Sequence, residues 1–290
     1  MAGKFTRSWS LMKASAAVLR SDKSLLLFPL LSGLCTVLVA ASFLVPVGAM
    51  VVGHVDAGGE AARELPLAAW LLMFAFYLVQ YFVIVFFQVA LTGSALMHLR
   101  GESTSVGAGL SLALGKLPQI FGYALIAATA GLLLRMLQER LGLIGRLVVG
   151  FIGLAWTVAT FLVAPILASQ DVGPIDAVKR SAELLKRSWG ENLIGNGGIG
   201  LVFSLLMVLA VLLAGALVVG AVAMQSVAAV VLAVLVAVLG LALLGLVQAS
   251  LQGIYSAALY RYAEAGEASP GFDQTLLQQA FSRKSQVGHS

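Results

Sequence analysis

Five stretches of this chain contain no aspartate, glutamate, lysine, arginine or histidine, and each is long enough to cross a lipid bilayer. A membrane-spanning helix needs about 20 predominantly apolar residues, because about 30 Å of hydrocarbon is crossed at about 1.5 Å per residue. The five stretches are Ser24–Gly53, Leu65–Met97, Leu117–Leu134, Leu147–Gln170 and Asn192–Tyr260. The last has room for two helices with a turn at 224–226, so the sequence predicts six spans.

The predicted fold class is all-α: a polytopic membrane protein with six transmembrane helices and amphipathic interfacial helices on the cytoplasmic side. The spans are expected at about 25–52, 67–97, 117–137, 145–168, 194–223 and 227–259. We expect them to form one membrane domain, residues 1–260. Residues 261–290 would form a tail, in which Phe272, Leu276, Ala280 and Phe281 predict one short helix.

The composition excludes two broad classes of protein. Apolar residues make up 60% of the chain and charged residues 11%, whereas soluble domains carry about 25% charged residues. A soluble enzyme is therefore not expected, and a disordered chain would need the opposite balance. Cys35 is the one cysteine, so neither a disulfide framework nor a cysteine-based metal site is predicted.

Lysine and arginine are distributed unevenly among the connections between the spans. Of these 18 residues, 14 lie in the N-terminal segment, the second connection, the fourth connection and the tail. Short loops that are rich in lysine and arginine stay on the cytoplasmic side of a membrane. We therefore predict that both termini are cytoplasmic, and that the first span is retained rather than cleaved as a signal peptide.

Three basic segments show apolar residues at helical spacing, which predicts helices that lie at the membrane surface. The first segment precedes the first span, the second lies within 103–116, and the third follows Pro174 with an apolar stripe. That stripe consists of Ile175, Val178, Ala182, Leu185 and Trp189. Each segment precedes a pair of spans, so we predict a threefold repeat over 1–98, 99–170 and 171–260. The simpler interpretation is that any polytopic protein has basic inner loops.

The third surface segment also carries the first set of candidate site residues, proposed to contact anionic lipid headgroups. These residues are Lys179, Arg180, Ser181, Lys186, Arg187 and Trp189. Cationic side chains and hydroxyls at the membrane surface are the groups that bind phosphate. The structural interpretation is a capped helix whose charged face is solvated.

A second candidate set is uncharged and lies within the spans. It consists of Gln80, Gln88, Gln248 and Gln252. A glutamine in hydrocarbon needs a hydrogen-bonding partner, so these side chains either line a polar path or join neighbouring helices. Pro29, Pro46 and Pro165 are expected to kink or end their helices.

The sequence contains none of the catalytic motifs that we searched for. No nucleophile elbow, zinc-protease motif or phosphate-binding loop occurs, so we predict no catalytic residue, no metal site, no cofactor and no enzyme activity. Nucleic acid is not an expected partner, because an excess of positive charge in a membrane protein usually reports topology. Arg135 is expected to reach the interface or to pair with Glu139.

The chain resembles a bacterial family of six-span integral membrane proteins of unknown function. The resemblance is carried by Pro165, by a G-P-x-x-A-x-K-R-S motif and by a W-G-E-N turn. The motif residues are Gly173, Pro174, Ala177, Lys179, Arg180, Ser181, Trp189, Gly190, Glu191 and Asn192. A more distant likeness, in the order of helices alone, is to the membrane domain of some glycerophosphodiester phosphodiesterases.

These observations lead to an expected function. The resemblance implies a bacterial inner membrane protein, and the absence of catalytic motifs favours a non-enzymatic module that organises the membrane or contacts lipids. Its expected partners are anionic lipids, together with a partner protein or a second copy of the chain. A transporter or channel for a small solute or lipid is the alternative, because the four glutamines can line a path.

Overall fold

A computed structural model describes residues 13–56, 67–189 and 198–265, and within these ranges the chain is helical, with short turns and no strand. Six segments are long and apolar enough to cross a membrane. They are Lys23–Ala49, Leu71–Leu99, Leu117–Arg140, Gly145–Ser169, Ser204–Ala223 and Val227–Glu264. The predicted all-α fold with six spans is confirmed, and the protein is a multi-pass membrane protein.

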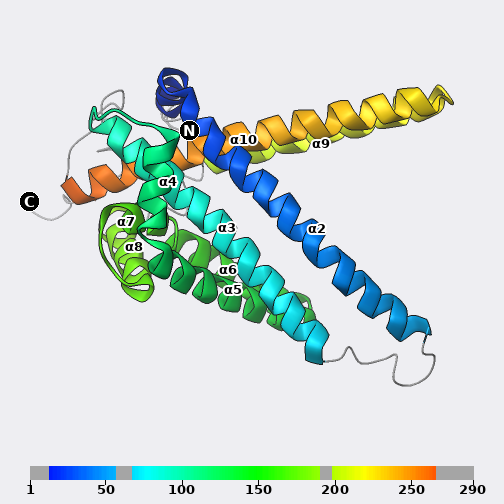
Figure 1. Ribbon diagram of the computed structural model, residues 1–290, viewed down its shortest axis with the longest axis horizontal. Coiled ribbons are helices and arrows are strands. Elements are labelled where there is room, and N and C mark those ends of the chain that lie inside the picture. The colour runs from blue at the N-terminus through cyan, green and yellow to red at the C-terminus, as the bar shows by residue number, and fades with distance from the viewer. Residues whose placement is uncertain (1–12, 57–66, 190–197, 266–290) are drawn as a thin grey trace, which may run out of the picture. The chain divides into compact units, whose positions relative to one another are not determined.

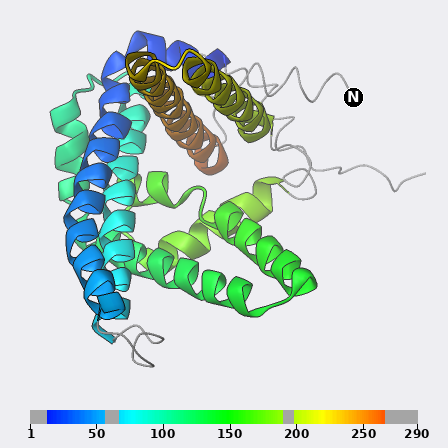
Figure 2. The same ribbon diagram turned by 90° about the vertical axis from the view of Figure 1, so that its right-hand side faces the viewer.

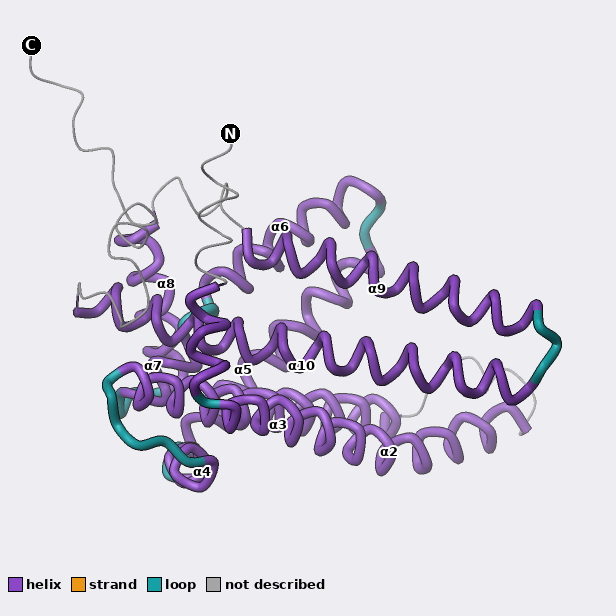
Figure 3. The backbone as a smooth tube through the Cα atoms, turned by 90° about the horizontal axis from the view of Figure 1, so that it is seen from above, coloured by secondary structure: helices purple, strands orange, loops and turns teal. Residues whose placement is uncertain are grey.

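The helices follow one another in a regular order (Figures 1 and 3). Their bounds are η1 (Lys23–Leu26), α2 (Leu27–Asp56), α3 (Leu67–Leu99), α4 (Val106–Leu114), α5 (Leu117–Arg140), α6 (Leu143–Ala159), α7 (Val163–Ser169), α8 (Pro174–Trp189), α9 (Gly198–Ala223) and α10 (Val227–Ala265). A further helix occupies 13–21. A short helix thus precedes each pair of spans, which is the order of elements that the threefold pattern predicts.

The chain divides into two compact units, residues 27–184 and residues 1–26 with 185–290. In the first unit, α2 and α3 lie side by side (Figure 2), and α3 also contacts α4, α5 and α7. In the second unit, α9 and α10 form a helical hairpin. That 1–260 acts as one domain stays a prediction, and the expected tail helix lies outside the described residues.

Helices α2, α9 and α10 expose apolar side chains along most of their length. Val45 on α2 is 75% exposed, Leu213 on α9 is 62% exposed and Val227 on α10 is 80% exposed. A soluble protein rarely exposes contiguous apolar surface of this extent. In a bilayer these side chains face lipid tails, so the exposure agrees with the six-span fold.

The fourth span is broken into α6 and α7, with a turn at 160–162. Pro165 explains the position of the break, because a proline ring clashes with the carbonyl group four residues earlier in a helix. Pro46, in contrast, lies inside α2 without ending it. Val163–Ala168 of α7 are all buried, so the short helix belongs to the core of its unit.

Helix α4 packs closely on α3 because it contains a glycine at the contact. A Cβ atom on Gly109 would lie 2.1 Å from Ser94 Oγ, 2.7 Å from Phe28 Cζ and 3.1 Å from the Ala90 carbonyl oxygen. Ser105 fixes the start of α4, since its hydroxyl accepts a hydrogen bond of 3.1 Å from the Ala108 N–H. Glycine lowers the intrinsic stability of a helix, but the packing of α4 on α3 requires the glycine at position 109.

We predict that Gly109→Ala destabilises the protein by about 1–3 kcal/mol, since an added methyl group must displace α4 from α3. Thermal unfolding in detergent measures the effect. Gly107→Ala is the matched control on the same helix, because its Cβ would meet only Ser105 Oγ at 3.9 Å. This variant should be neutral or more stable, by up to about 1 kcal/mol. Equal effects of the two substitutions would contradict the packing argument.

Candidate functional site

Helix α8 turns one face toward the protein and another toward its surroundings. Ala177, Ser181, Leu184 and Leu185 are buried, and their spacing places them on one side of the helix. Ile175 of the predicted apolar stripe is 59% exposed, whereas Leu185 of the same stripe is buried. The face that the protein covers therefore overlaps the predicted stripe only in part. The small side chains of Ala177 and Ser181 permit a closer approach of the backbone than Ile175 and Val178 would.

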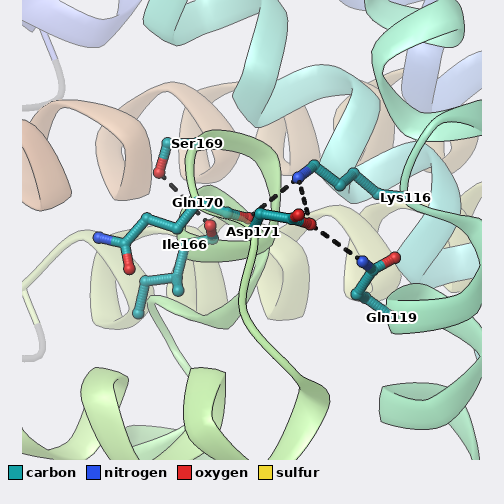
Figure 4. A network of polar contacts seen from close by, with 6 residues as sticks. All are labelled: Lys116, Gln119, Ile166, Ser169, Gln170 and Asp171. Atoms are coloured by element: carbon teal, nitrogen blue, oxygen red, sulfur yellow. Dashed lines mark hydrogen bonds and ion pairs between the residues drawn. The ribbon is translucent and has the colours of Figure 1, made fainter.

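Polar contacts from α5 fix the segment that leads into α8 (Figure 4). Lys116 Nζ lies 3.1 Å from Asp171 Oδ1 and donates a hydrogen bond of 3.2 Å to the Gln170 carbonyl oxygen. Gln119 Nε2 donates to Asp171 Oδ1 at 3.2 Å. Asp171 is 82% exposed, so this ion pair contributes little to stability by itself. Its effect is to set where the chain leaves α7 and enters α8.

Close packing adds a second attachment of α8 to α5. A Cβ atom on Gly122 would lie 2.8 Å from Pro174 Cγ. The absence of a side chain at Gly122 thus lets the first residue of α8 rest against α5. The start of α8 is held by both polar and apolar contacts.

Ser181 forms a third attachment, to the break in the fourth span. Its Oγ accepts a hydrogen bond of 3.1 Å from the Leu162 N–H, and both residues are fully buried. A phosphate headgroup outside the protein cannot reach this hydroxyl. Ser181 therefore does not belong to the lipid-contacting set predicted from the sequence. A stripe of polar residues on a helix does not reveal which one points inward.

The cationic side chains of α8 lie on its exposed side. Lys179, Arg180 and Lys186 are exposed, and Lys179 Nζ lies 3.4 Å from Asp176 Oδ1. Lys179 and Lys186 are seven residues apart and so lie on the same side, whereas Arg180 is rotated by about 100° from Lys179. The side chains of Arg187 and Trp189 lie outside the described residues.

The four glutamines of the second candidate set occupy different surroundings. Gln80 donates a hydrogen bond of 3.1 Å from Nε2 to the Thr36 carbonyl oxygen, and so joins α3 to α2. Gln88 and Gln252 are exposed and Gln248 is half-buried. Gln80 and Gln88 belong to one compact unit, Gln248 and Gln252 to the other. The contact of Gln80 is of the kind expected for a residue that joins two helices.

Gln248 and Gln252 lie in the second half of α10. The helix starts at Val227 and has 39 residues, and about 20 residues are enough to cross the hydrocarbon. The two glutamines come 21 and 25 residues after that start. A helix of this length can cross the hydrocarbon before it reaches them.

Three polar residues and a glycine form a row along α5 that the sequence interpretation missed. Gln119, Tyr123, Gly131 and Arg135 are separated by multiples of four residues and so form one ridge of the helix. Tyr123 forms a side-chain hydrogen bond with Thr160 at the break of the fourth span. The four-residue spacing is visible in the sequence, but it was obscured by the small apolar residues between these positions.

Hydroxyl groups of α3 face the C-terminal half of this α5 row. A Cβ atom on Gly131 would lie 3.1 Å from the Tyr81 hydroxyl. Arg135 NH1 donates to the Tyr77 hydroxyl, and Arg135 Nε donates to Glu139 Oε1 at 3.1 Å. The predicted pairing of Arg135 with Glu139 is thus present. Within the described ranges no three histidine, cysteine, aspartate or glutamate residues gather in a way that fits a metal ion.

We predict that Ser181→Ala destabilises the protein by about 1–3 kcal/mol, because the buried Leu162 N–H loses its acceptor. Thermal unfolding in detergent tests this. Ser111→Ala is the control, because Ser111 is an exposed serine on the short helix α4. That variant should change the stability by about 0.5 kcal/mol or less. A Ser181→Ala protein as stable as the control variant would show that Leu162 finds another acceptor.

The comparisons with known proteins give a family but no activity. The family model that matches the chain is described as a family of unknown function, DUF6159, and the match extends over residues 67–272. No curated protein and no solved structure matches the chain. The likeness to glycerophosphodiester phosphodiesterases receives no support. Because the match covers more than half of the chain and five of its six spans, the protein belongs to the family of unknown function DUF6159.

Proposed function

We propose that this protein is a non-enzymatic module of the bacterial inner membrane that organises its surroundings by binding anionic lipid headgroups through α8. Both termini lie on the cytoplasmic side, together with α8. The observation that carries the proposal is the division of α8 into a buried face and an exposed cationic face. A helix that is anchored in this way presents its basic residues at a fixed place relative to the spans.

The chemistry of the exposed side fits the membrane surface. Ile175 lies one helical turn before Lys179, and its side chain is 59% exposed. An apolar side chain next to basic ones is typical of helices that lie at the boundary between headgroups and acyl chains. Each basic residue near an anionic surface contributes about 1 kcal/mol of attraction.

The contacts of Lys116 support the placement of α8 on the basic side. Lys116 belongs to the second connection and Asp171 to the fourth. In a chain of six spans, even-numbered connections share one side of the membrane, and these two carry many of the lysines and arginines. Their direct contact agrees with the placement of both connections on one side of the membrane, and the charge distribution favours the inner side.

The first test measures lipid selectivity. We expect K179Q/R180Q/K186Q in reconstituted protein to lower the preference for spin-labelled phosphatidylglycerol over phosphatidylcholine by about fivefold or more, because cationic contacts are lost. Electron paramagnetic resonance of the motionally restricted lipid gives the preference. K179R/K186R keeps the charge and should retain it. An unchanged preference in the glutamine variant would refute the role of α8.

The second test concerns orientation. In a Cys35→Ser background, we expect Gly142→Cys to react with a membrane-impermeant thiol reagent in intact cells, and Ser290→Cys to react only after permeabilisation. Gly142 lies in the turn between α5 and α6, and a Cβ atom there meets nothing within 4 Å. Labelling of Ser290→Cys in intact cells would place the C-terminus outside and contradict the proposal.

A transporter for a small solute or lipid is the second candidate function. It is favoured by the α5 row, where Gln119, Tyr123 and Arg135 follow one ridge of a span. Gly131→Leu would fill the space beside Tyr81 and should abolish a flux that passes along this row. Solute uptake into proteoliposomes is the measurement, and equal uptake by the variant would exclude this path.

A further inference from the structure

The turn between α5 and α6 carries an arginine cluster on the side of the membrane away from α8. Helix α5 ends at Arg140, helix α6 begins at Leu143, and only Leu141 and Gly142 separate them. Both helices belong to membrane spans. A turn this short cannot rise far from the bilayer, so its side chains lie at the level of the lipid headgroups. The cluster consists of Arg135, Arg140 and Arg146.

Two of the three arginines have N–H groups that could donate hydrogen bonds to a ligand. Arg146 is exposed and uses Nε to donate to the Gln138 carbonyl oxygen at 3.3 Å, which leaves its two terminal nitrogens open. Arg140 is exposed and has no side-chain partner within the described part of the chain. Arg135 is occupied by Glu139 and Tyr77. Arg140 and Arg146 are therefore the two arginines prepared to bind a ligand.

The basic charge at the turn exceeds the acidic charge between 135 and 146. Glu139 is the one acidic residue between Arg135 and Arg146, and its carboxylate is paired with Arg135. Exposed apolar side chains stand beside the arginines, with Leu141 38% exposed and Leu147 60% exposed. An arginine fork binds phosphate oxygens in a bidentate manner. The combination of arginine and leucine thus matches a phospholipid, whose phosphate group is attached to acyl chains.

We propose that Arg140 and Arg146 bind the phosphate group of an anionic phospholipid in the leaflet opposite to α8. Helix α8 is attached near the first residues of α5, through Lys116 and Gly122, and the arginine turn follows the last residue of α5. These ends are about 35 Å apart along the helix axis, which is the thickness of a hydrocarbon core and its boundary. One span thus connects two headgroup sites. The proposal extends the lipid contact proposed for α8 but rests on different residues.

The test uses the same spin-label assay on reconstituted full-length protein. We expect R140Q/R146Q to lower the preference for phosphatidylglycerol over phosphatidylcholine by about fivefold or more. R140K/R146K keeps the charge but lacks the planar fork, so an intermediate loss is expected. Thermal unfolding of each variant shows that the fold is retained, as is expected for exposed side chains.

The outcomes separate this proposal from that for α8. If R140Q/R146Q keeps the full preference while K179Q/R180Q/K186Q loses it, the turn does not bind lipid and the proposed function stands. If only the turn variant loses the preference, the turn binds lipid and the role of α8 is refuted. Inorganic phosphate is the competing ligand. If R140Q/R146Q keeps the lipid preference but loses the binding of millimolar inorganic phosphate, the site is one for a free anion, and the lipid assignment is overturned.

Discussion

The structure depends first on the absence of water from hydrocarbon, which requires every backbone N–H and C=O group within a span to find its partner in the protein. The broken fourth span shows how this requirement is met. Thr160 N–H donates to the Trp156 carbonyl oxygen at 3.0 Å, and Val163 N–H donates to that of Thr160 at 3.1 Å. Leu162 N–H has the Ser181 hydroxyl as its acceptor. A side chain from a helix outside the spans thus completes the backbone hydrogen bonding of a span.

The six spans could be predicted because length and the absence of charge are properties of single segments. What the sequence left undetermined depends on contacts between segments. The buried face of α8 is an example, since it includes Leu185 of the predicted apolar stripe but also Ala177, which lay outside that stripe. Ala177 is inside because α8 approaches its neighbours closely, as the contact of Pro174 with Gly122 shows. Helical periodicity predicts that α8 has an apolar face. It does not predict which residues the neighbouring helices bury.

The candidate sites show the same limit more strongly. The basic residues of α8 were found because charge near a span is conspicuous, whereas Ser181 was assigned to the wrong side of the helix. The α5 row was missed for a related reason: Gly131 has no polar side chain, and it belongs to the row only because it leaves space for the Tyr81 hydroxyl of α3. A residue whose role is to leave space for another cannot be recognised without its neighbour. Gly109 and Gly122 belong to the same class.

Helix α5 connects the lysine at its start with the arginines of the turn at its end, and these arginines need an explanation of their own. By the rule that orients the spans, arginines in an outer turn are unfavourable, because they weaken the bias that keeps the other 14 lysines and arginines inside. Arg135 is compensated by Glu139 and Tyr77, but Arg140 and Arg146 have no acidic partner among the residues that the structure describes. An uncompensated charge at the headgroup level is stabilised when lipid phosphate supplies the missing partner. The electrostatic attraction that we propose for α8 therefore applies to this turn as well, where the proposed counterion of the arginines is an anionic lipid.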